Sequence, residues 1–401
     1  MELVGRKLLY KWYIELGNKD FDEHLNQNRH LCIFNNGTWD WKKDEFRQGS
    51  PADCSTLSTQ LPYIPWAELS EEIRNLVMTY ISNFQPVEEE FHYIIQNVAF
   101  CLDPSNRKEV VFVFSGKGSN GKSAFMNLIV RALGDYAGTA AQAMFTQQPP
   151  DSQKPREDIM AVRNCRVLCV SELTGTLVLG TMKVLSGHDR FTARHNHSSQ
   201  IKFYLHFITF ILTNETPKIS AGAGDYGTWR RLIFAVFRIT FVKEEELTDP
   251  VTQRVGMSAA AFDAAQDTIA VGFLSLLVEY KRKQHIYPLP AAYLAEQKSQ
   301  ENKNSIYIRF LNDAINFPVV NDETQRMQNQ GSPVTMMTLF LSFTEWMKMR
   351  RSSMNNIDYD TFNEQTKVLL EQRFIRPYLD PISRDWMYEV TVKDLFIVNR
   401  R

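Results

Sequence analysis

Residues 110–124 read V-V-F-V-F-S-G-K-G-S-N-G-K-S-A, and this stretch decides how the chain folds. The apolar run at residues 110–114 predicts a short buried strand, and the glycines after it predict a tight loop. Gly116, Gly121, Lys122 and Ser123 fit the spacing G-x-x-x-x-G-K-S, which is typical of a phosphate-binding loop. An apolar helix is expected directly after the loop, up to Gly134.

The loop spacing suits a triphosphate for a physical reason. Glycines let backbone N–H groups curl around phosphate oxygens, and the N-terminus of the following helix adds partial positive charge. The ammonium of Lys122 can reach the β- and γ-phosphates, and the Ser123 hydroxyl can bind Mg²⁺. The alternative is a glycine-rich turn with a chance lysine, and the strand and helix that flank the loop argue against it. The expected nucleotide-binding residues are Gly116, Lys117, Gly118, Ser119, Asn120, Gly121, Lys122, Ser123 and Ala124.

Composition sets limits on the class of protein. The chain has 401 residues, of which 44% are hydrophobic and 23% charged, as in ordinary globular domains. A formal net charge of −1 excludes nucleic-acid binding by bulk charge, so any such site must be a local basic patch. The 5 cysteines lack Cys-x-x-Cys spacing, which favours a reducing compartment without a disulfide framework or zinc site. We expect no membrane segment and no signal peptide, because no apolar run approaches roughly 18 residues.

Three segments are expected along the chain. Residues 1–105 predict a mostly helical collar or oligomerisation module, with a hairpin where Asn36-Gly37 lies between apolar runs. Residues 106–242 alternate strands and helices around the phosphate loop. Its continuous apolar runs, the second and third at residues 166–170 and 207–212, predict an α/β core with a largely parallel sheet.

Residues 243–401 predict a C-terminal helical region that ends in a small α+β unit. After a charged connection, helical periodicity is expected from Ile269 onward. Two helices and a strand pair in the last part would suit a winged-helix shape. Their expected ranges are 336–349 and 362–374 for the helices, and 386–390 and 391–398 for the strands.

Polar residues stand at the ends of the second and third predicted core strands. Glu172 follows the strand at residues 166–170, where a carboxylate can hold Mg²⁺ and orient an attacking water. Asn214 follows the next strand, where an amide can position that water and sense hydrolysis. The alternatives are a solvated carboxylate at a strand end and an ordinary turn asparagine.

Arg230 and Arg231 precede a further apolar strand. A guanidinium presents a rigid, permanently charged fork that suits phosphoryl oxygens. Offered to the ATP of a neighbouring subunit, it would act as an arginine finger that stabilises charge in the transition state. A surface arginine pair or a salt bridge is the alternative interpretation.

A basic segment lies between Glu172 and Asn214 in the sequence. Residues 187–197 mix basic, aromatic and imidazole groups with turn residues, which suits the backbone of single-stranded nucleic acid. A solvated basic loop remains the alternative, and a metal site is disfavoured because the histidines lack ligand spacing. The expected DNA-binding residues are Lys183, Arg190, Arg194, His195, His197 and Lys202.

Taken in order, these motifs resemble the superfamily 3 helicases, over about residues 110–242. Within them the chain is similar to the primase-helicases of large DNA viruses (poxviruses, iridoviruses and asfarviruses) and to related phage and plasmid proteins. A weaker resemblance to the collar-side domain of that family extends forward over the predicted hairpin. The matching runs are G-K-G-S-N-G-K-S, V-S-E-L, K-V-L-S-G-H-D-R-F-T-A-R, I-L-T-N-E-T-P-K-I and G-T-W-R-R-L.

The resemblance implies an AAA+-type P-loop ATPase that uses ATP and Mg²⁺. Such a protein would form a homo-oligomeric ring, expected to be a hexamer, and would move along DNA during genome replication in the cytoplasm or nucleus of an infected cell. Glu172 would be the Walker B acid and Asn214 the sensor, while Arg230 or Arg231 would be the finger that acts in trans. Residues 183–194 would match the region leading to the DNA-contacting pore loop.

Two departures from the family pattern bear on these expectations. Ser171 stands where many such enzymes place an acid, which leaves Glu172 to carry the site alone. The chain also has no room for a primase domain ahead of the helicase. It would therefore be the helicase portion of a longer protein, or a relative that works with a separate primase.

Two other functions remain open at the level of sequence. The first is a nucleotide-governed ATPase that loads or packages DNA without unwinding it. The second is a catalytically weak interaction ring, against which the set of Lys122, Glu172, Asn214 and Arg231 argues.

Overall fold

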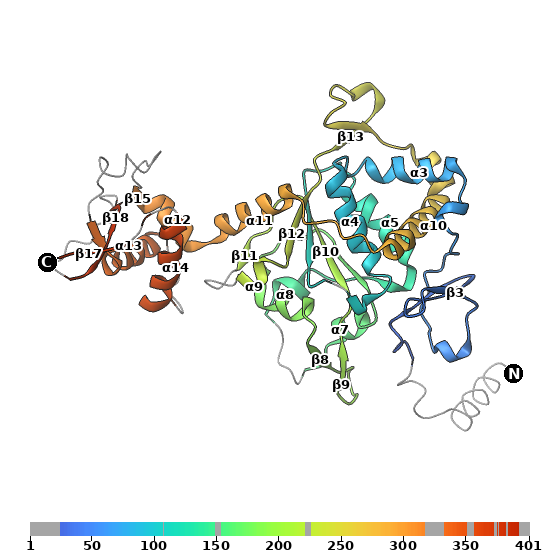
Figure 1. Cartoon of the computed structure of the whole chain (residues 1–401), viewed down its shortest axis with the longest axis horizontal. Coiled ribbons are helices and arrows are strands. Elements are labelled where there is room, and N and C mark those ends of the chain that lie inside the picture. The colour runs from blue at the N-terminus through green and yellow to red at the C-terminus, as the bar shows by residue number, and fades with distance from the viewer. Residues whose placement is uncertain are drawn as a thin grey trace. The chain divides into compact units, whose positions relative to one another are not determined.

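The fold comes from a computed structural model in which two compact units are distinct (Figure 1). The first unit takes in the described residues up to Lys218 together with Arg230–Gln297, and the second comprises Ile219–Trp229 and Lys298–Arg401. The described part of the expected segment 1–105 therefore lies in the first unit, and segment 106–242 lies there except for Ile219–Trp229. Segment 243–401 is divided between both units. The structure describes residues 25–106, 108–148, 154–220, 226–316, 333–350, 357–372, 375, 377–381 and 384–392.

A five-stranded parallel sheet forms the centre of the first unit (Figure 1). Its order is β12-β4-β10-β6-β5, and every neighbouring pair is parallel, as the sequence predicts. β10 lies between β4 and β6 although it follows both in the chain. The short edge strand β5 was not predicted, because Ala-Gly-Thr has little β propensity. The strands are β4 (Val111–Ser115), β5 (Ala137–Thr139), β6 (Val167–Val170), β10 (Ile208–Thr213) and β12 (Leu232–Val236).

Helices from distant parts of the chain pack around α5 (Lys122–Leu133), the helix that follows the phosphate loop. α10 (Ala259–Lys283) contacts α5 and also α3 (Glu71–Ser82) and α4 (Glu88–Phe100). One apolar core joins these helices to the sheet. The N-terminal helices thus belong to the packing of the α/β core, which burial of their apolar faces stabilises.

α10 begins earlier than the sequence predicts. The periodicity was expected from Ile269, but Ser258 caps a helix that starts at Ala259, its side chain accepting a hydrogen bond from Ala261 N. By length and composition alone this helix would be long and apolar enough to span a membrane, a test that a core helix also passes. Half of its most apolar 18-residue window is buried in the fold, as in a core helix.

The N-terminal region carries an antiparallel sheet ahead of its helices, and is thus less helical than expected. β1 (Leu31–Phe34) and β2 (Gly37–Asp40) form the predicted hairpin, and β3 (Glu45–Arg47) adds a third strand that was not predicted. Asp53 accepts two hydrogen bonds from Arg47, and this contact lowers the pKa of the Asp53 carboxyl. The role of the region as a collar stays a prediction.

The remaining elements of the first unit surround these layers. The expected basic loop contains a hairpin, because β8 and β9 pair as antiparallel strands. The charged connection after residue 242 contributes β14, which pairs with β13. These elements are α6 (Ala143–Thr146), α7 (Glu157–Val162), β7 (Leu177–Val178), α8 (Leu179–Ser186), β8 (Arg190–Ala193), β9 (Ile201–Tyr204), β13 (Thr240–Val242) and β14 (Gln253–Val255).

The second unit combines helices with short strands, but its strand pairing differs from the prediction, and the winged-helix shape stays a prediction. β18 pairs with β16 and β17, whereas β19 pairs with β15, so the expected strands at 386–390 and 391–398 do not pair with each other. Residues 373, 374 and 393–398 of the predicted elements lie outside the described residues. The strands are β11 (Ile219–Ser220), β15 (Ile315–Asn316), β16 (Pro333–Thr335), β17 (Tyr378–Leu379), β18 (Trp386–Glu389) and β19 (Thr391–Val392). The helices are α9 (Tyr226–Trp229), α12 (Ile306–Ala314), α13 (Met336–Met349) and α14 (Tyr359–Gln372), while α11 (Ala291–Asn304) crosses the boundary between units.

One buried arginine ties the N-terminal sheet to the core. Arg166, just before β6, donates to the carbonyl oxygens of Leu31 (2.6 Å) and Leu102. Its guanidinium also lies over the ring of Tyr136, 4.0 Å from the centroid. Burial raises the pKa of the Tyr136 hydroxyl to about 12. A single side chain therefore joins three segments that are far apart in sequence.

We predict that Arg166→Met lowers the free energy of unfolding by about 2–4 kcal/mol, because two buried carbonyl groups lose their donor. Urea unfolding followed by tryptophan fluorescence measures this change. Lys154→Met, at an exposed position, is the control and should change stability by less than about 0.5 kcal/mol. Equal stability of both variants would contradict the proposed tie.

Candidate functional site

The phosphate loop connects the end of β4 to the start of α5. Gly116 has φ 149°, and a Cβ there would lie 2.3 Å from Asn120 Nδ2 and 2.5 Å from the Phe237 carbonyl oxygen. Gly121 has φ 79° and is the N-cap of α5, where no side chain caps the helix. Lys122 N donates to Asn120 Oδ1 (3.4 Å), and the helix start, which has no capping side chain at Gly121, is suited to an anion.

Lys122 is the centre of the site. Its side chain is buried, and its ammonium donates to Gly116 O (2.7 Å), Asn120 Oδ1 (2.9 Å) and Asn214 Oδ1 (3.4 Å). All three acceptors are neutral, and in the described part of the chain no carboxylate pairs with this ammonium. Burial lowers the pKa of Lys122. A buried cation with only neutral partners favours a bound anion.

Strand register brings Asn214 and Glu172 to the same end of the sheet as the phosphate loop, where the parallel strands end. Ser115 pairs with Thr213, so Asn214 lies level with the start of the loop. Val170 pairs with Ile211, and Leu173 N then donates to Leu212 O (3.0 Å), so the turn at Glu172 also lies at this end. The carboxyl ends of parallel strands are where such sheets bind ligands.

Glu172 combines exposure with a strained backbone. Its φ of 54° lies in the left-handed region, which is costly for a residue with a side chain. Both Glu172 and Ser123 are exposed. A carboxylate and a hydroxyl are oxygen donors of the kind that Mg²⁺ prefers, so these two residues fit the predicted metal site.

Arg230 and Arg231 lie at the opposite end of the sheet, where the strands β4 and β12 begin. Arg231 precedes β12, whose first residue Leu232 pairs with Val111 at the start of β4. The length of β4 then separates both arginines from the phosphate loop by about 13 Å along the strand. The structure therefore does not bring them together with Lys122 of the same chain.

The two arginines differ in their surroundings. The Arg231 side chain is only 11% exposed and forms an ion pair with Glu109 (2.7 Å), whereas the Arg230 side chain is 71% exposed. Arg231 also donates to Lys183 O (2.9 Å) and Ser186 Oγ (3.3 Å). The salt-bridge interpretation thus applies to Arg231.

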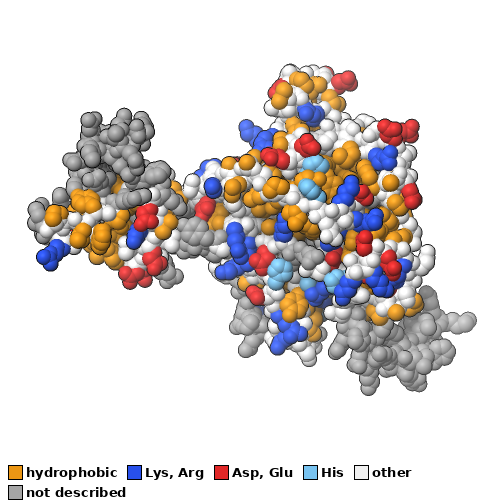
Figure 2. Space-filling view, in the orientation of Figure 1, with side chains coloured by type: hydrophobic (Ala, Val, Ile, Leu, Met, Phe, Trp, Pro, Cys, Tyr) orange, Lys and Arg blue, Asp and Glu red, His pale blue; other side chains and the backbone are white. Residues whose placement is uncertain are grey.

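The predicted DNA-binding residues map onto the hairpin of β8 and β9 and onto α8. The hairpin projects from the first unit (Figure 1), and Lys and Arg side chains gather on it (Figure 2). Arg190 and Lys202 are exposed on its strands, and His197 is exposed at its tip. Lys183 is exposed on α8, and Arg194 is half-buried after β8. DNA contact by these residues stays a prediction.

His195 has partners within the chain. Its Nδ1 contacts Glu157 Oε2 (2.7 Å), and Arg163 Nη1 lies 3.3 Å from its Nε2. Asn196 N donates to Glu157 Oε1 (2.6 Å). The Asn196 N–H and the His195 ring lower the pKa of the Glu157 carboxyl. These contacts attach the tip of the hairpin to α7.

Sequence reasoning missed an aromatic pocket of about 670 Å³ that adjoins the loop. Rings from α3, β13 and α10 line it together with one face of α5, and Phe84 and Phe241 lie 5.6 Å apart between ring centroids. Phe241 N donates to Ser119 O (2.7 Å), which attaches β13 to the loop. The lining is Tyr80, Phe84, Ser119, Gly121, Ala124, Asn127, Leu128, Arg131, Phe241, Gly256, Met257, Ala259, Phe262 and Gln266.

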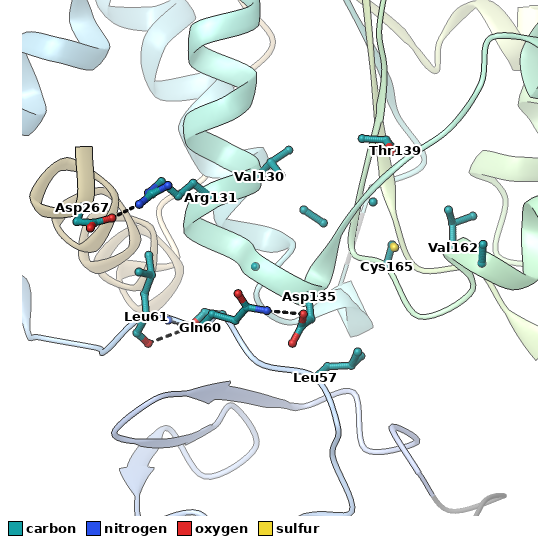
Figure 3. Close-up of a pocket in the computed structure, with 15 residues that line it drawn as sticks. Leu57, Gln60, Leu61, Val130, Arg131, Asp135, Thr139, Val162, Cys165 and Asp267 are labelled. Atoms are coloured by element: carbon teal, nitrogen blue, oxygen red, sulfur yellow. Dashed lines mark hydrogen bonds and ion pairs between the residues drawn. The ribbon is translucent and has the colours of Figure 1, made fainter. Parts of the chain in front are cut away.

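A wider pocket, of about 850 Å³, lies near the other end of α5 (Figure 3). Gln60 donates to Asp135 Oδ1 (2.7 Å) beside it, and Arg131 pairs with Asp267. No residue of the phosphate loop lines this pocket. Its size therefore does not make it part of the candidate site.

Comparisons with known proteins support the sequence resemblance. A family model described as "D5 N terminal like" matches residues 19–85. That match covers the β1–β3 sheet and the whole of α3, and its first residues, 19–24, lie outside the described ones.

Several relatives carry the printed name "Putative helicase". One from Acanthamoeba polyphaga mimivirus is 29% identical over 82% of this chain and 34% of its own length. Another, from Invertebrate iridescent virus 6, is 26% identical over 56% of this chain and 24% of its own length. The chain resembles the helicases of large DNA viruses. It spans about a third or less of the length of these relatives.

Among solved structures, the C-terminal region of NrS-1 is similar at 12% sequence identity. The match covers 84% of this chain and 78% of that chain, with a TM-score of 0.45. The α/β fold class rests on the parallel sheet of the chain itself.

We predict that Gly116→Ala and Gly118→Ala differ sharply in nucleotide binding. The first places a Cβ against Asn120 and the Phe237 carbonyl group, whereas a Cβ at Gly118 meets nothing within 4 Å. We expect Gly116→Ala to weaken binding of a fluorescent ATP analogue at least about tenfold, or ~1.4 kcal/mol, and Gly118→Ala to bind like wild type. Equal Kd values for the two variants would refute the described loop geometry.

Proposed function

We propose that this chain is an ATP-driven DNA helicase of superfamily 3 that works as a ring, expected to be a hexamer. The observation that carries the proposal is the buried Lys122 ammonium, held among neutral oxygens beside Asn214. The resemblance to viral helicases and the projecting basic hairpin support it.

In this proposal the triphosphate lies against the loop. The γ-phosphoryl oxygens accept hydrogen bonds from the Lys122 ammonium. These bonds replace the ones that the ammonium donates to Gly116 O and Asn214 Oδ1. Ser123 and Glu172 would hold Mg²⁺, which supplies positive charge against the phosphates. Glu172 accepts a proton from the attacking water, and the Asn214 amide orients that water. Stacking on aromatic rings holds the base in the pocket beside Phe241.

Arg230 is the finger in this mechanism. It lies at the end of the sheet away from its own loop and is 71% exposed, so that it can serve a neighbouring subunit. Arg231 is engaged within its own chain by Glu109 and α8. The ATP site is therefore complete only between two copies of the chain.

The other parts of the proposal concern partners and place of action. Each subunit would contribute its hairpin to a channel that holds single-stranded or forked DNA, which concentrates positive charge despite the net charge of −1. A primase domain in the same polypeptide, or a separate primase, would be a partner. The protein would act in the cytoplasm or nucleus of an infected cell, as a helicase of viral or mobile-element replication.

We predict that Lys122→Ala lowers the rate of ATP hydrolysis roughly 100-fold or more, because the phosphates lose the main positive charge that faces them. Steady-state phosphate release with and without single-stranded DNA measures this effect. Lys43→Ala, an exposed lysine of the N-terminal sheet, is the control. Wild-type turnover by Lys122→Ala would rule out the site.

Strand displacement on a forked duplex decides between helicase and loading ATPase. We expect wild-type protein to displace the strand in an ATP-dependent reaction. Hydrolysis without displacement would instead support a DNA-loading or packaging function.

We predict that Arg230→Ala lowers hydrolysis roughly 1,000-fold while nucleotide binding is retained, as for the loss of an arginine finger. Mixing Arg230→Ala with Lys122→Ala should restore part of the turnover, because some interfaces then combine an intact Lys122 with an intact Arg230. A mixture as inactive as its components would show that Arg230 does not act in trans.

A further inference from the structure

Glu109 lies at the end of the sheet opposite the phosphate loop. There it connects the start of β4 to the segment after α8 and to the arginine pair before β12. It lies just before β4, and its Oε2 contacts Arg231 Nη2 at 2.7 Å and Arg230 Nη2 at 3.9 Å. Its Oε1 contacts His188 Nδ1 at 3.0 Å. We call Glu109, His188, Arg230 and Arg231 the Glu109 junction.

The junction is attached to α8 as well. Arg231 Nη1 donates to Lys183 O (2.9 Å) and Ser186 Oγ (3.3 Å), which lie in the last turn of α8. His188 follows that helix and lies two residues before β8, which begins at Arg190. The segment between α8 and the basic hairpin is thus held by the same carboxylate that holds the arginine pair.

The charges in the junction make it responsive to a nearby anion. Partial burial would raise the pKa of Glu109, but the hydrogen bond to His188 and the charges of Arg231 and Arg230 bring it below its usual value. Glu109 is therefore a carboxylate near neutral pH, with Arg231 tightly paired and Arg230 only loosely paired. A phosphate group of a neighbouring subunit would compete with Glu109 for Arg230.

We propose that Glu109 is a positioning residue that couples nucleotide contact by Arg230 to the placement of the basic hairpin, with His188 as the link. This inference rests on the proposed function, since it takes Arg230 as the finger. When Arg230 turns to the phosphate, the Glu109 carboxylate loses its contact with Arg230 and retains those with Arg231 and His188. The carboxylate then moves toward its two remaining partners. That shift reaches the hairpin through the short segment 188–189.

His188→Ala tests the link while leaving the arginine pair in place. The His188 side chain is 55% exposed, so we expect the fold, binding of the ATP analogue and hydrolysis without DNA to match wild type. His285→Ala, another exposed histidine, is the control. The readout is the Kd for labelled single-stranded DNA, measured by anisotropy with and without a non-hydrolysable ATP analogue.

We expect the analogue to change the DNA Kd of wild type and of His285→Ala at least about threefold. His188→Ala and Glu109→Gln should each lose that change, and the double variant should lose no more than either single variant. A nucleotide effect of wild-type size in His188→Ala would overturn the inference. So would a wild-type Kd that the analogue does not alter, or single-variant effects that add in the double variant.

Failure of the proposed function would show differently. It would appear as wild-type protein that does not hydrolyse ATP, or that hydrolyses it without displacing a strand. The Kd measurement needs neither hydrolysis nor unwinding, so the two failures are distinguishable.

Discussion

The structure of the site depends on one buried cation. Lys122 enters the fold at the first turn of α5, and backbone and amide oxygens surround its ammonium. Burial of a charge without an opposite charge is costly, so the site is at its most favourable with an anion bound. Three features act together with this charge to favour an anion. They are the glycine geometry of the loop, the start of α5 without a capping side chain at Gly121, and the position of Asn214. A different residue at position 122 would remove the reason for each of them.

Much of the core could be predicted from sequence because its signals are local. A continuous apolar run followed by Gly-x-x-x-x-Gly-Lys-Ser predicts a strand, a loop and a helix without reference to distant residues. Glu172 and Asn214 could be placed at strand ends by the same means. The strand order and the left-handed backbone of Glu172 depend on tertiary packing, and no sequence pattern encodes them.

The features missed from sequence have physical reasons in common. The hairpin strands β8 and β9 are largely exposed, so they lack the apolar alternation that indicates a half-buried strand. The aromatic pocket takes Tyr80, Phe241 and Phe262 from three separate elements, so no local spacing connects them. Glu109 is a single carboxylate before a strand, and its importance appears only when Arg231 and His188 are folded against it.

β12 has a consequence for how an assembly of these chains would behave. At one end it is preceded by Arg231, and just after its other end Phe237 accepts a hydrogen bond from Asn120 of the phosphate loop through its carbonyl oxygen (3.4 Å). β12 is an edge strand of the sheet and pairs with β4 along its whole length. An extended strand held by a hydrogen-bonded neighbour resists stretching, so it transmits a displacement along its axis. In the proposed assembly, the phosphate loop of a subunit and the arginine that it offers to its neighbour would thus lie near the two ends of one strand. In a ring, a movement at one phosphate loop would then shift the arginine that contacts the next subunit. A conformational change in one subunit would in this way be transmitted to its neighbour.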